Sequence, residues 1–261
     1  MENRYGRDSE LNIEITGRGD RSIISDVYFT PPFKIMKPFY ENDLMRVLQM
    51  SASPGVMEGD CQKINMRVGE GAKAEIYSQS FEKIHKMETG HAVRHIDISV
   101  DKNSFCIYNP LPTIPYAGSA FNNTINVRLK DHTSVFIYED MLISGRVAGG
   151  ESFAYRYYQS LVNIYEDNTL TYRDNTLYKP DKMDMDGIGL YEGYTHLLGM
   201  VVCGMDIYDE ISAFFDGYNA PWGITLNDSG YVVIRALGSS AQPLQKISGK
   251  IKELAYRKYR G

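Results

Sequence analysis

Residues 61–68, CQKINMRV, alternate apolar with polar side chains, and this period of two sets the structural class of the chain. Side chains two positions apart share one face of a strand, and here that face carries Ile64, Met66 and Val68. The alternation returns in residues 92–101 and 121–129. A helix would instead repeat its apolar positions every three or four residues. These stretches therefore predict strands that are buried on one face.

Residues 133–143 carry large side chains on both faces, which predicts a strand covered on both sides. Turn-forming triplets such as Gly69-Glu70-Gly71 separate the predicted strands, roughly a dozen residues apart. From residue 11 to about 180 we therefore expect mostly β structure, in a β-helix-like stack of antiparallel strands; an antiparallel sandwich or barrel is the alternative. The 20 tyrosines fit this prediction, since tyrosine favours strands.

The pattern changes after about residue 190. Residues 206–215 place apolar side chains at helical spacing, and residues 231–237 predict a strand. Pro243 suits the first turn of a last helix. Because no linker rich in Pro, Ser or Gly interrupts the chain, we expect one domain over residues 1–261 that ends in a small helical, α+β part.

Composition limits the classes of partner. The 261 residues include 33 acidic and 28 basic side chains, a net charge of −5, whereas proteins that bind nucleic acid need clustered cations. No uninterrupted apolar stretch reaches about 18 residues, so we expect neither a membrane span nor a membrane partner. The polar start lacks a signal peptide's apolar core, and three scattered cysteines suit a reducing compartment. We therefore expect a cytoplasmic protein.

The motifs of common enzyme and metal sites are absent. The sequence has no P-loop, no dinucleotide fingerprint and no G-x-S-x-G nucleophile turn. It has no C-x-x-C or H-E-x-x-H motif, and His91 and His95 would lie too far apart on a strand to share one ion. The residues alone therefore predict a binding or scaffold protein without a tight metal site.

Five segments, taken in order, resemble the urease accessory proteins called UreD, or UreH in some bacteria. They are residues 30–40 (TPPFKIMKPFY), 53–60 (SPGVMEGD), 78–85 (SQSFEKIH), 109–116 (NPLPTIPY), and Asp140 followed by 145–148 (GRVA) and 151–153 (ESF). Two later pieces, 172–176 (YRDNT) and 193–196 (GYTH), are similar to the UreH branch. Each motif is weak by itself, but their order and spacing are specific. Beyond residue 200 the resemblance thins.

The resemblance implies a maturation factor that is not an enzyme. Such proteins bind apo-urease together with a helical partner, UreF, and a GTPase, UreG, and the assembly delivers nickel to urease. The implied fold is β-helix-like, with a water-filled tunnel for nickel. We therefore expect no tightly bound cofactor and nickel(II) as a transient cargo, because a conduit must let its ion leave. The alternative is a docking scaffold that takes no part in nickel passage.

Two aspartates in the matching segments are candidates for lining such a tunnel. Asp60 follows Gly59 at a turn before a strand, where its carboxylate either attracts a hydrated cation or bonds its own backbone. Asp140 shares a strand face with Tyr138 and Leu142, so its carboxylate must be paired, hydrated or exposed to a polar channel.

Arg146 and Glu151 follow Asp140 closely enough to meet it across a turn. In one interpretation Arg146 neutralises Asp140 or Glu151 in a buried structural pair. In the other, Glu151 and Asp140 line the nickel route and Arg146 sets the local charge.

Two serines would supply hydroxyl ligands. Ser78 and Ser80 are expected to share a strand face with Ile76, where small hydroxyls either leave room for water and a passing ion or allow close packing. Gln79 and Lys83 would fix the adjacent turn or touch a partner.

The segment 109–116 is rich in proline. Pro110, Pro112 and Pro115 cannot donate to a strand ladder, which predicts an edge or a loop. Together with Tyr116 they are candidates for a partner surface, and a rigid cap over the core is the alternative.

Overall fold

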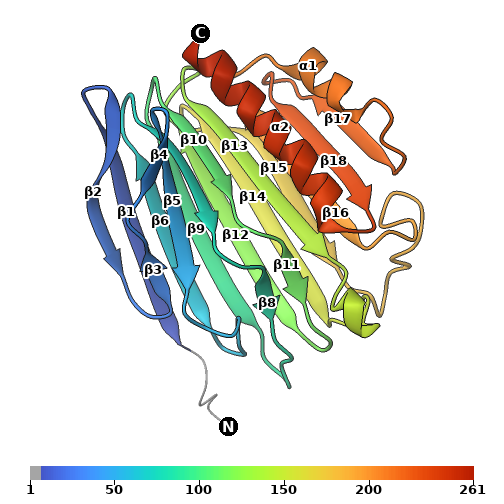
Figure 1. Cartoon of the computed structure of the whole chain (residues 1–261). Coiled ribbons are helices and arrows are strands. Elements are labelled where there is room, and N and C mark those ends of the chain that lie inside the picture. The colour runs from blue at the N-terminus through green and yellow to red at the C-terminus, as the bar shows by residue number, and fades with distance from the viewer. Residues whose placement is uncertain (1–6) are drawn as a thin grey trace.

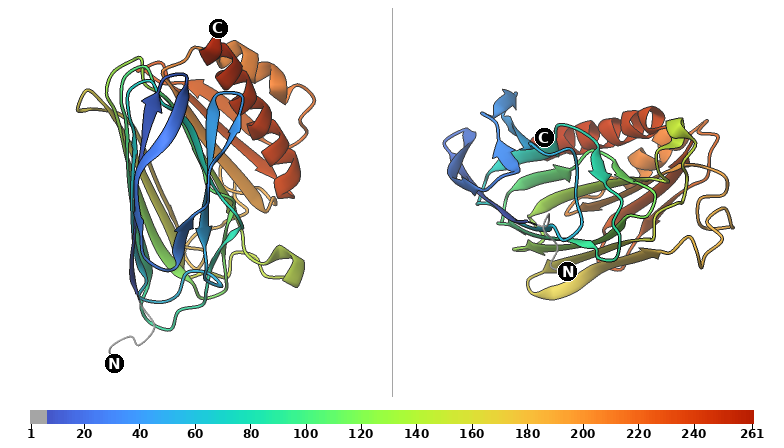
Figure 2. Two further views of the ribbon diagram at one scale, coloured as in Figure 1. Left: turned by 60° about the vertical axis from the view of Figure 1, so that its left-hand side comes forward. Right: turned by 90° about the horizontal axis from the view of Figure 1, so that it is seen from below.

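Two β-sheets face each other as the layers of a sandwich (Figures 1 and 2). The computed structural model describes residues 7–261. In this range, sheet 1 contains β1 (Asp8–Arg18), β2 (Arg21–Phe29), β6 (Cys61–Val68), β9 (Ala92–Val100), β12 (Ala120–Leu129), β14 (Tyr157–Glu166) and β15 (Thr169–Tyr178). Sheet 2 contains β3 (Phe33–Ile35), β4 (Phe39–Glu41), β5 (Leu44–Ser51), β7 (Lys73–Ser78), β8 (Glu82–Ile84), β10 (Phe105–Asn109), β11 (Thr113–Pro115), β13 (Val135–Ile143), β16 (His196–Cys203), β17 (Trp222–Leu226) and β18 (Val232–Gly238).

The chain coils between the two sheets. Sheet 1 has the strand order β15-β14-β12-β9-β6-β1-β2, and the main path of sheet 2 is β17-β18-β16-β13-β10-β7-β5-β3. From β5 to β14 the long strands alternate between sheets, so each turn of the coil adds one strand to each layer.

The mostly-β prediction is confirmed, but the antiparallel arrangement is wrong for the centre of both sheets. β1, β6, β9, β12 and β14 pair in parallel, and so do β5, β7, β10 and β13. The antiparallel pairs involve outer strands, such as β1–β2, β14–β15 and β13–β16. A chain that crosses to the opposite sheet between two neighbouring strands re-enters the first sheet in its original direction, which makes the neighbours parallel.

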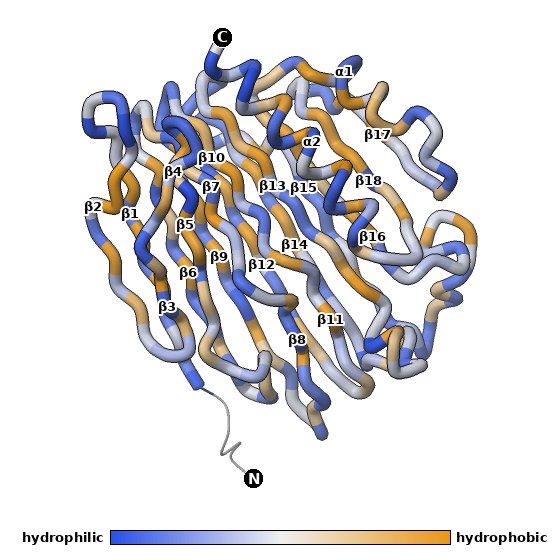
Figure 3. The backbone as a smooth tube through the Cα atoms, in the orientation of Figure 1, coloured by the Kyte–Doolittle hydropathy of each residue, from blue (hydrophilic) through white to orange (hydrophobic). Residues whose placement is uncertain are grey.

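Parallel pairing in register stacks equivalent side chains into rows across each sheet. One row of sheet 1 consists of Leu11, Ile64, Ile96, Ile125 and Val162. A row of sheet 2 consists of Val47, Ile76, Tyr108, Tyr138 and Val201. These rows are buried against each other in the central cluster, where each aliphatic side chain contributes about 1.5–3 kcal/mol. The alternation that points them inward is visible along the strands in Figure 3.

The last helix, α2 (Ala241–Arg260), lies across the outer face of sheet 2 (Figure 1). The buried apolar side chains of α2 pack against the outward-facing residues Val135, Ile137 and Met141 of β13. β13 is therefore covered on both faces, as predicted. The expected helix at residues 206–215 is shorter, since α1 spans Tyr208–Ser212 and continues as the 3-10 turn Ala213–Phe215. A second 3-10 turn spans Val147–Gly149. Over residues 7–261, no helix is both long and apolar enough to cross a membrane.

Candidate functional site

A row of polar residues interrupts the apolar interior, two positions along the strands from the rows just described. In sheet 1 the register aligns Ser9, Gln62, Arg94, Asn123, Ser160 and Thr176. In sheet 2 it aligns Gln49 with Ser78, and Asp140 with Gly199 and Arg235. Because side chains two positions apart share a face, this polar row faces inward like the apolar rows beside it.

The polar row separates two apolar clusters. On one side lies the central cluster, and on the other lies an end cluster that includes Phe121, Leu142 and Tyr158. A buried polar layer must satisfy its hydrogen bonds internally or hold water. The row is therefore the part of the interior that suits a hydrated ion.

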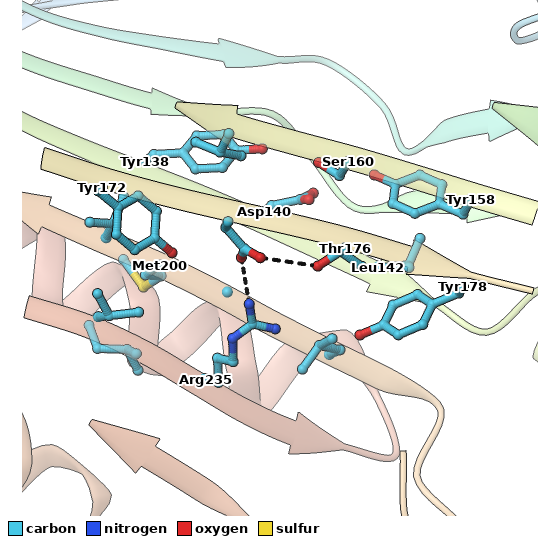
Figure 4. Close-up of a pocket in the computed structure, with 17 residues that line it drawn as sticks. Tyr138, Asp140, Leu142, Tyr158, Ser160, Tyr172, Thr176, Tyr178, Met200 and Arg235 are labelled. Carbon is cyan, nitrogen blue, oxygen red and sulfur yellow. Dashed lines mark hydrogen bonds and ion pairs between the residues drawn. The ribbon is translucent and has the colours of Figure 1, made fainter. Parts of the chain in front are cut away.

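Among the described residues, two cavities open along this row and share Tyr138, Asp140 and Tyr158. The Arg235 cavity leaves about 50 Å³ for water between Asp140 and Arg235 (Figure 4). The Arg94 cavity leaves about 30 Å³ and extends from Asp140 past Arg94 to Ser78. One water needs about 10–15 Å³ on this measure, so each cavity is large enough for water.

Arg94 is the fixed charge of the Arg94 cavity. Its Nε donates to Gln62 Oε1 at 2.7 Å, and its Nη2 donates to Glu82 Oε2 at 2.5 Å. Burial lowers the pKa of the Arg94 guanidinium, but the charge and hydrogen bond of Glu82, together with Tyr108 and Tyr158, outweigh burial and raise it, so Arg94 stays cationic. Sequence reasoning missed Arg94, although it shares its strand face with Ile96 and Ile98.

Asp140 lies where the two cavities meet. Both neighbouring arginines pair elsewhere, and within residues 7–261 no cation lies at ion-pair distance from Asp140. Burial, reinforced by the nearby charge of Asp174, raises the pKa of Asp140 to about 6. The buried oxygens Ser160 Oγ and Asn123 Oδ1, one in each cavity, also have no hydrogen-bond partner. These oxygens are the groups best placed to hold water or a cation.

An ion pair stands at the other end of the Arg235 cavity. Arg235 Nη2 donates to Asp174 Oδ2 at 2.5 Å, and the Thr176 hydroxyl donates to Asp174 Oδ1 at 3.2 Å. The side chains of Arg235 and Asp174 are 45% and 28% exposed, so this end of the cavity reaches the surface. Neither residue was predicted as part of the site, although Asp174 lies in the YRDNT motif.

The other predicted ligands are distributed differently. Ser78 lines the Arg94 cavity, where its hydroxyl accepts the Leu111 N–H at 2.7 Å. Ser80 is exposed beyond the end of β7, so the predicted shared strand face is wrong. The Asp60 carboxylate accepts the backbone N–H of Met57 at 2.8 Å and lines neither cavity, which is the turn-forming alternative.

Arg146 and Glu151 form a structural pair outside the cavities. Glu151 Oε2 accepts from Arg146 Nη2 at 2.6 Å, and Glu151 Oε1 accepts the Ala117 N–H at 2.5 Å. The Arg146 guanidinium also lies 4.6 Å from the centre of the Tyr116 ring. Arg146 therefore pairs with Glu151, but this pair is not buried as predicted, since the Arg146 side chain is 55% exposed, and the expected meeting with Asp140 is wrong.

The proline-rich segment covers the interior. β11 pairs with β8 and β13, Pro112 and Pro115 are buried, and Pro110 lines the Arg94 cavity. This placement matches the alternative of a rigid cap and leaves Pro112 and Pro115 no surface to offer a partner. Three side chains near this end of the fold keep exposed surface: Gln79, Lys83 and, in part, Tyr116.

Comparison with known proteins gives a consistent result. The family model described as UreD urease accessory protein matches residues 7–261, including the part after residue 200. The urease accessory protein UreD of Acetivibrio thermocellus is 36% identical over 266 residues, which cover 98% of this chain and 100% of that protein. UreH of Helicobacter acinonychis is 33% identical over 97% of both chains, and UreD of Bacillus cereus is 27% identical over 91% and 89%. The chain belongs to the UreD family of urease accessory proteins.

Proposed function

We propose that this chain is a cytoplasmic, non-enzymatic urease maturation factor that binds apo-urease together with UreF and, through UreF, the GTPase UreG. It passes nickel(II) toward the urease active site along the polar row. Family membership supports the role in urease maturation. The observation that carries the nickel proposal is the meeting of two cavities at Asp140 inside the sandwich.

The chemistry of the polar row suits a cation in transit. It offers carboxylate, amide and hydroxyl oxygens, which bind nickel more weakly than imidazole or thiolate does. Burial raises the pKa of Cys106 to about 12, which keeps this thiol neutral and a poor ligand. Within the described chain, no group of three or more His, Cys, Asp or Glu residues could hold a metal ion. The fixed charge of Arg94 also opposes long residence of a cation nearby.

The test combines capture of partners with activation of urease. The full chain is produced with the urease proteins, UreF and UreG, as wild type, Asp140→Ala and Asp97→Ala. Asp97 is a matched control, because its carboxylate pairs with Arg128 on the outer face of sheet 1. We expect all three forms to capture UreF and apo-urease, and only Asp140→Ala to lower the nickel content and activity of urease.

Two outcomes would contradict the proposal, and they differ. Failure of the wild-type chain to capture either partner, with both partners folded, would exclude the role in the assembly. Normal nickel loading with Asp140→Ala would instead favour the docking scaffold without nickel passage.

A further inference from the structure

The Arg235 cavity contains more ligand oxygens than a simple polar passage requires. Asp140 and Asp174 line the same space, from β13 and β15. The Ser160 hydroxyl lines it too, and this side chain is 6% exposed and without a hydrogen-bond partner. Two carboxylates and a free hydroxyl are the donors that a partly hydrated divalent cation takes.

Positive charge beside these oxygens comes from Arg235. β18 places Arg235 in register with Gly199 of β16, which is in register with Asp140 of β13. A Cβ at Gly199 would lie 4.0 Å from its nearest heavy atom, so the glycine leaves open space between Asp140 and Arg235. The guanidinium reaches over this space to Asp174.

Arg235 and Arg94 differ in how firmly they are held. The Arg94 side chain is 10% exposed and donates to both Gln62 and Glu82. The Arg235 side chain is 45% exposed, and its ion pair with Asp174 is at the surface end of the cavity. Arg235 can therefore turn into water with little loss of hydration, whereas Arg94 cannot.

We propose that Asp140, Asp174 and Ser160 form a divalent-cation binding site in which Arg235 is a built-in competitor. A cation that enters the cavity displaces the guanidinium from Asp174, and the guanidinium returns as the cation leaves. Two carboxylates against one guanidinium leave a net negative charge, which favours a doubly charged ion over the guanidinium. The identification of this cation as nickel rests on the proposed function, but the chemistry of the site does not.

The test measures binding of Ni²⁺ alone to the isolated full chain by equilibrium dialysis at pH 7.5. Arg235→Gln removes the competing charge and should lower the Kd for Ni²⁺ roughly fivefold, the effect of a partly exposed ion pair. Arg235→Lys keeps the charge and should stay near wild type. Adding Asp174→Asn to Arg235→Gln should raise the Kd at least to the wild-type value, since one ligand carboxylate is lost.

The matched control is Arg128→Gln, which breaks the Arg128–Asp97 pair on the outer face of sheet 1. It should leave the Kd unchanged. Equal affinity of wild type and Arg235→Gln, both folded by circular dichroism, would overturn the proposal, and so would an equal gain in Arg128→Gln. Because urease is absent from the assay, failure here leaves nickel delivery to be judged separately by urease activation.

Discussion

Replacing Asp140 with asparagine should make the protein more stable at neutral pH, even though it removes a proposed ligand. Burial, reinforced by the charge of Asp174, raises the pKa of the Asp140 carboxyl from 3.8 to about 6. Asparagine keeps the size and one acceptor oxygen of the side chain but cannot ionise. The folded state of the variant therefore no longer holds a poorly solvated negative charge.

The size of the gain follows from the difference in pKa between the folded and unfolded chain. One pKa unit corresponds to about 1.4 kcal/mol, so the ionised carboxylate destabilises the folded state by about 3 kcal/mol at pH 7.5. Because the folded-state pKa is the higher one, the folded chain binds more protons, and stability falls as pH rises from about 4 through 6. At pH 5 roughly half of the destabilisation, about 1.6 kcal/mol, remains.

Urea denaturation of the wild type and Asp140→Asn at pH 7.5 and pH 5 measures this effect. The free energy of unfolding of the variant should exceed that of the wild type by up to about 3 kcal/mol at pH 7.5 and by about half as much at pH 5. Asp97→Asn, which changes a 42% exposed carboxylate, should stay within about 0.5 kcal/mol of wild type at both values. A gain that is absent at pH 7.5, or equal at both pH values, would refute the reasoning about buried charge.

Three further changes test other parts of the structure. Gly199→Val should obstruct the Arg235 cavity and reduce the nickel loading of urease. Gly223→Val, where the added Cβ meets nothing within 4 Å, should leave nickel loading unchanged. Equal nickel content in urease matured with either variant would contradict passage through this cavity. Lys252→Met should lower the free energy of unfolding, measured by urea denaturation, by about 3–5 kcal/mol, because it leaves the buried Glu139 carboxylate without its cationic partner. Arg257→Met on the same helix should change the free energy of unfolding little. Similar losses in both variants would show that the buried pair is unimportant. Burial raises the pKa of Asp43, but hydrogen bonds from Lys73 and Tyr256 outweigh it and bring the pKa to about 2. Asp43→Asn should therefore cost about 2 kcal/mol at pH 7 and progressively less as pH falls from about 4 toward 2, which thermal unfolding at pH 7 and pH 3 would check; an equal loss at both values would show that the charge of Asp43 is not the cause.

Local alternation was enough to predict the strands but not their pairing. β6 begins and ends at the predicted residues, Cys61–Val68, and β12 and β13 agree within two residues. Alternation tells which side chains face inward, and it is the same in parallel and antiparallel sheets. The coiling of the chain, which makes the central strands parallel, therefore cannot be predicted from the sequence pattern of any single segment.

The candidate site shows the same limit. Asp140 could be identified because a carboxylate interrupts an otherwise apolar face, and Arg94 on β9 offered the same signal. Ser160 carries no such signal, since its place beside Asn123 depends on the register between strands far apart in the sequence. A polar row assembled from one residue per strand is visible only after the strands are aligned.

Because six of the seven strands of sheet 1 contribute one residue each to the polar row, the geometry of the coil determines how far that row extends. Five strand-to-strand intervals separate Ser9 from Thr176, and at about 4.8 Å each they span roughly 24 Å. A nickel route along this row, as proposed above, would change its length only in whole increments, by gain or loss of one turn of the coil. The affinity of that route for an ion, by contrast, would change with a point mutation of one residue in the row. Evolution could therefore alter the length and the selectivity of the route independently.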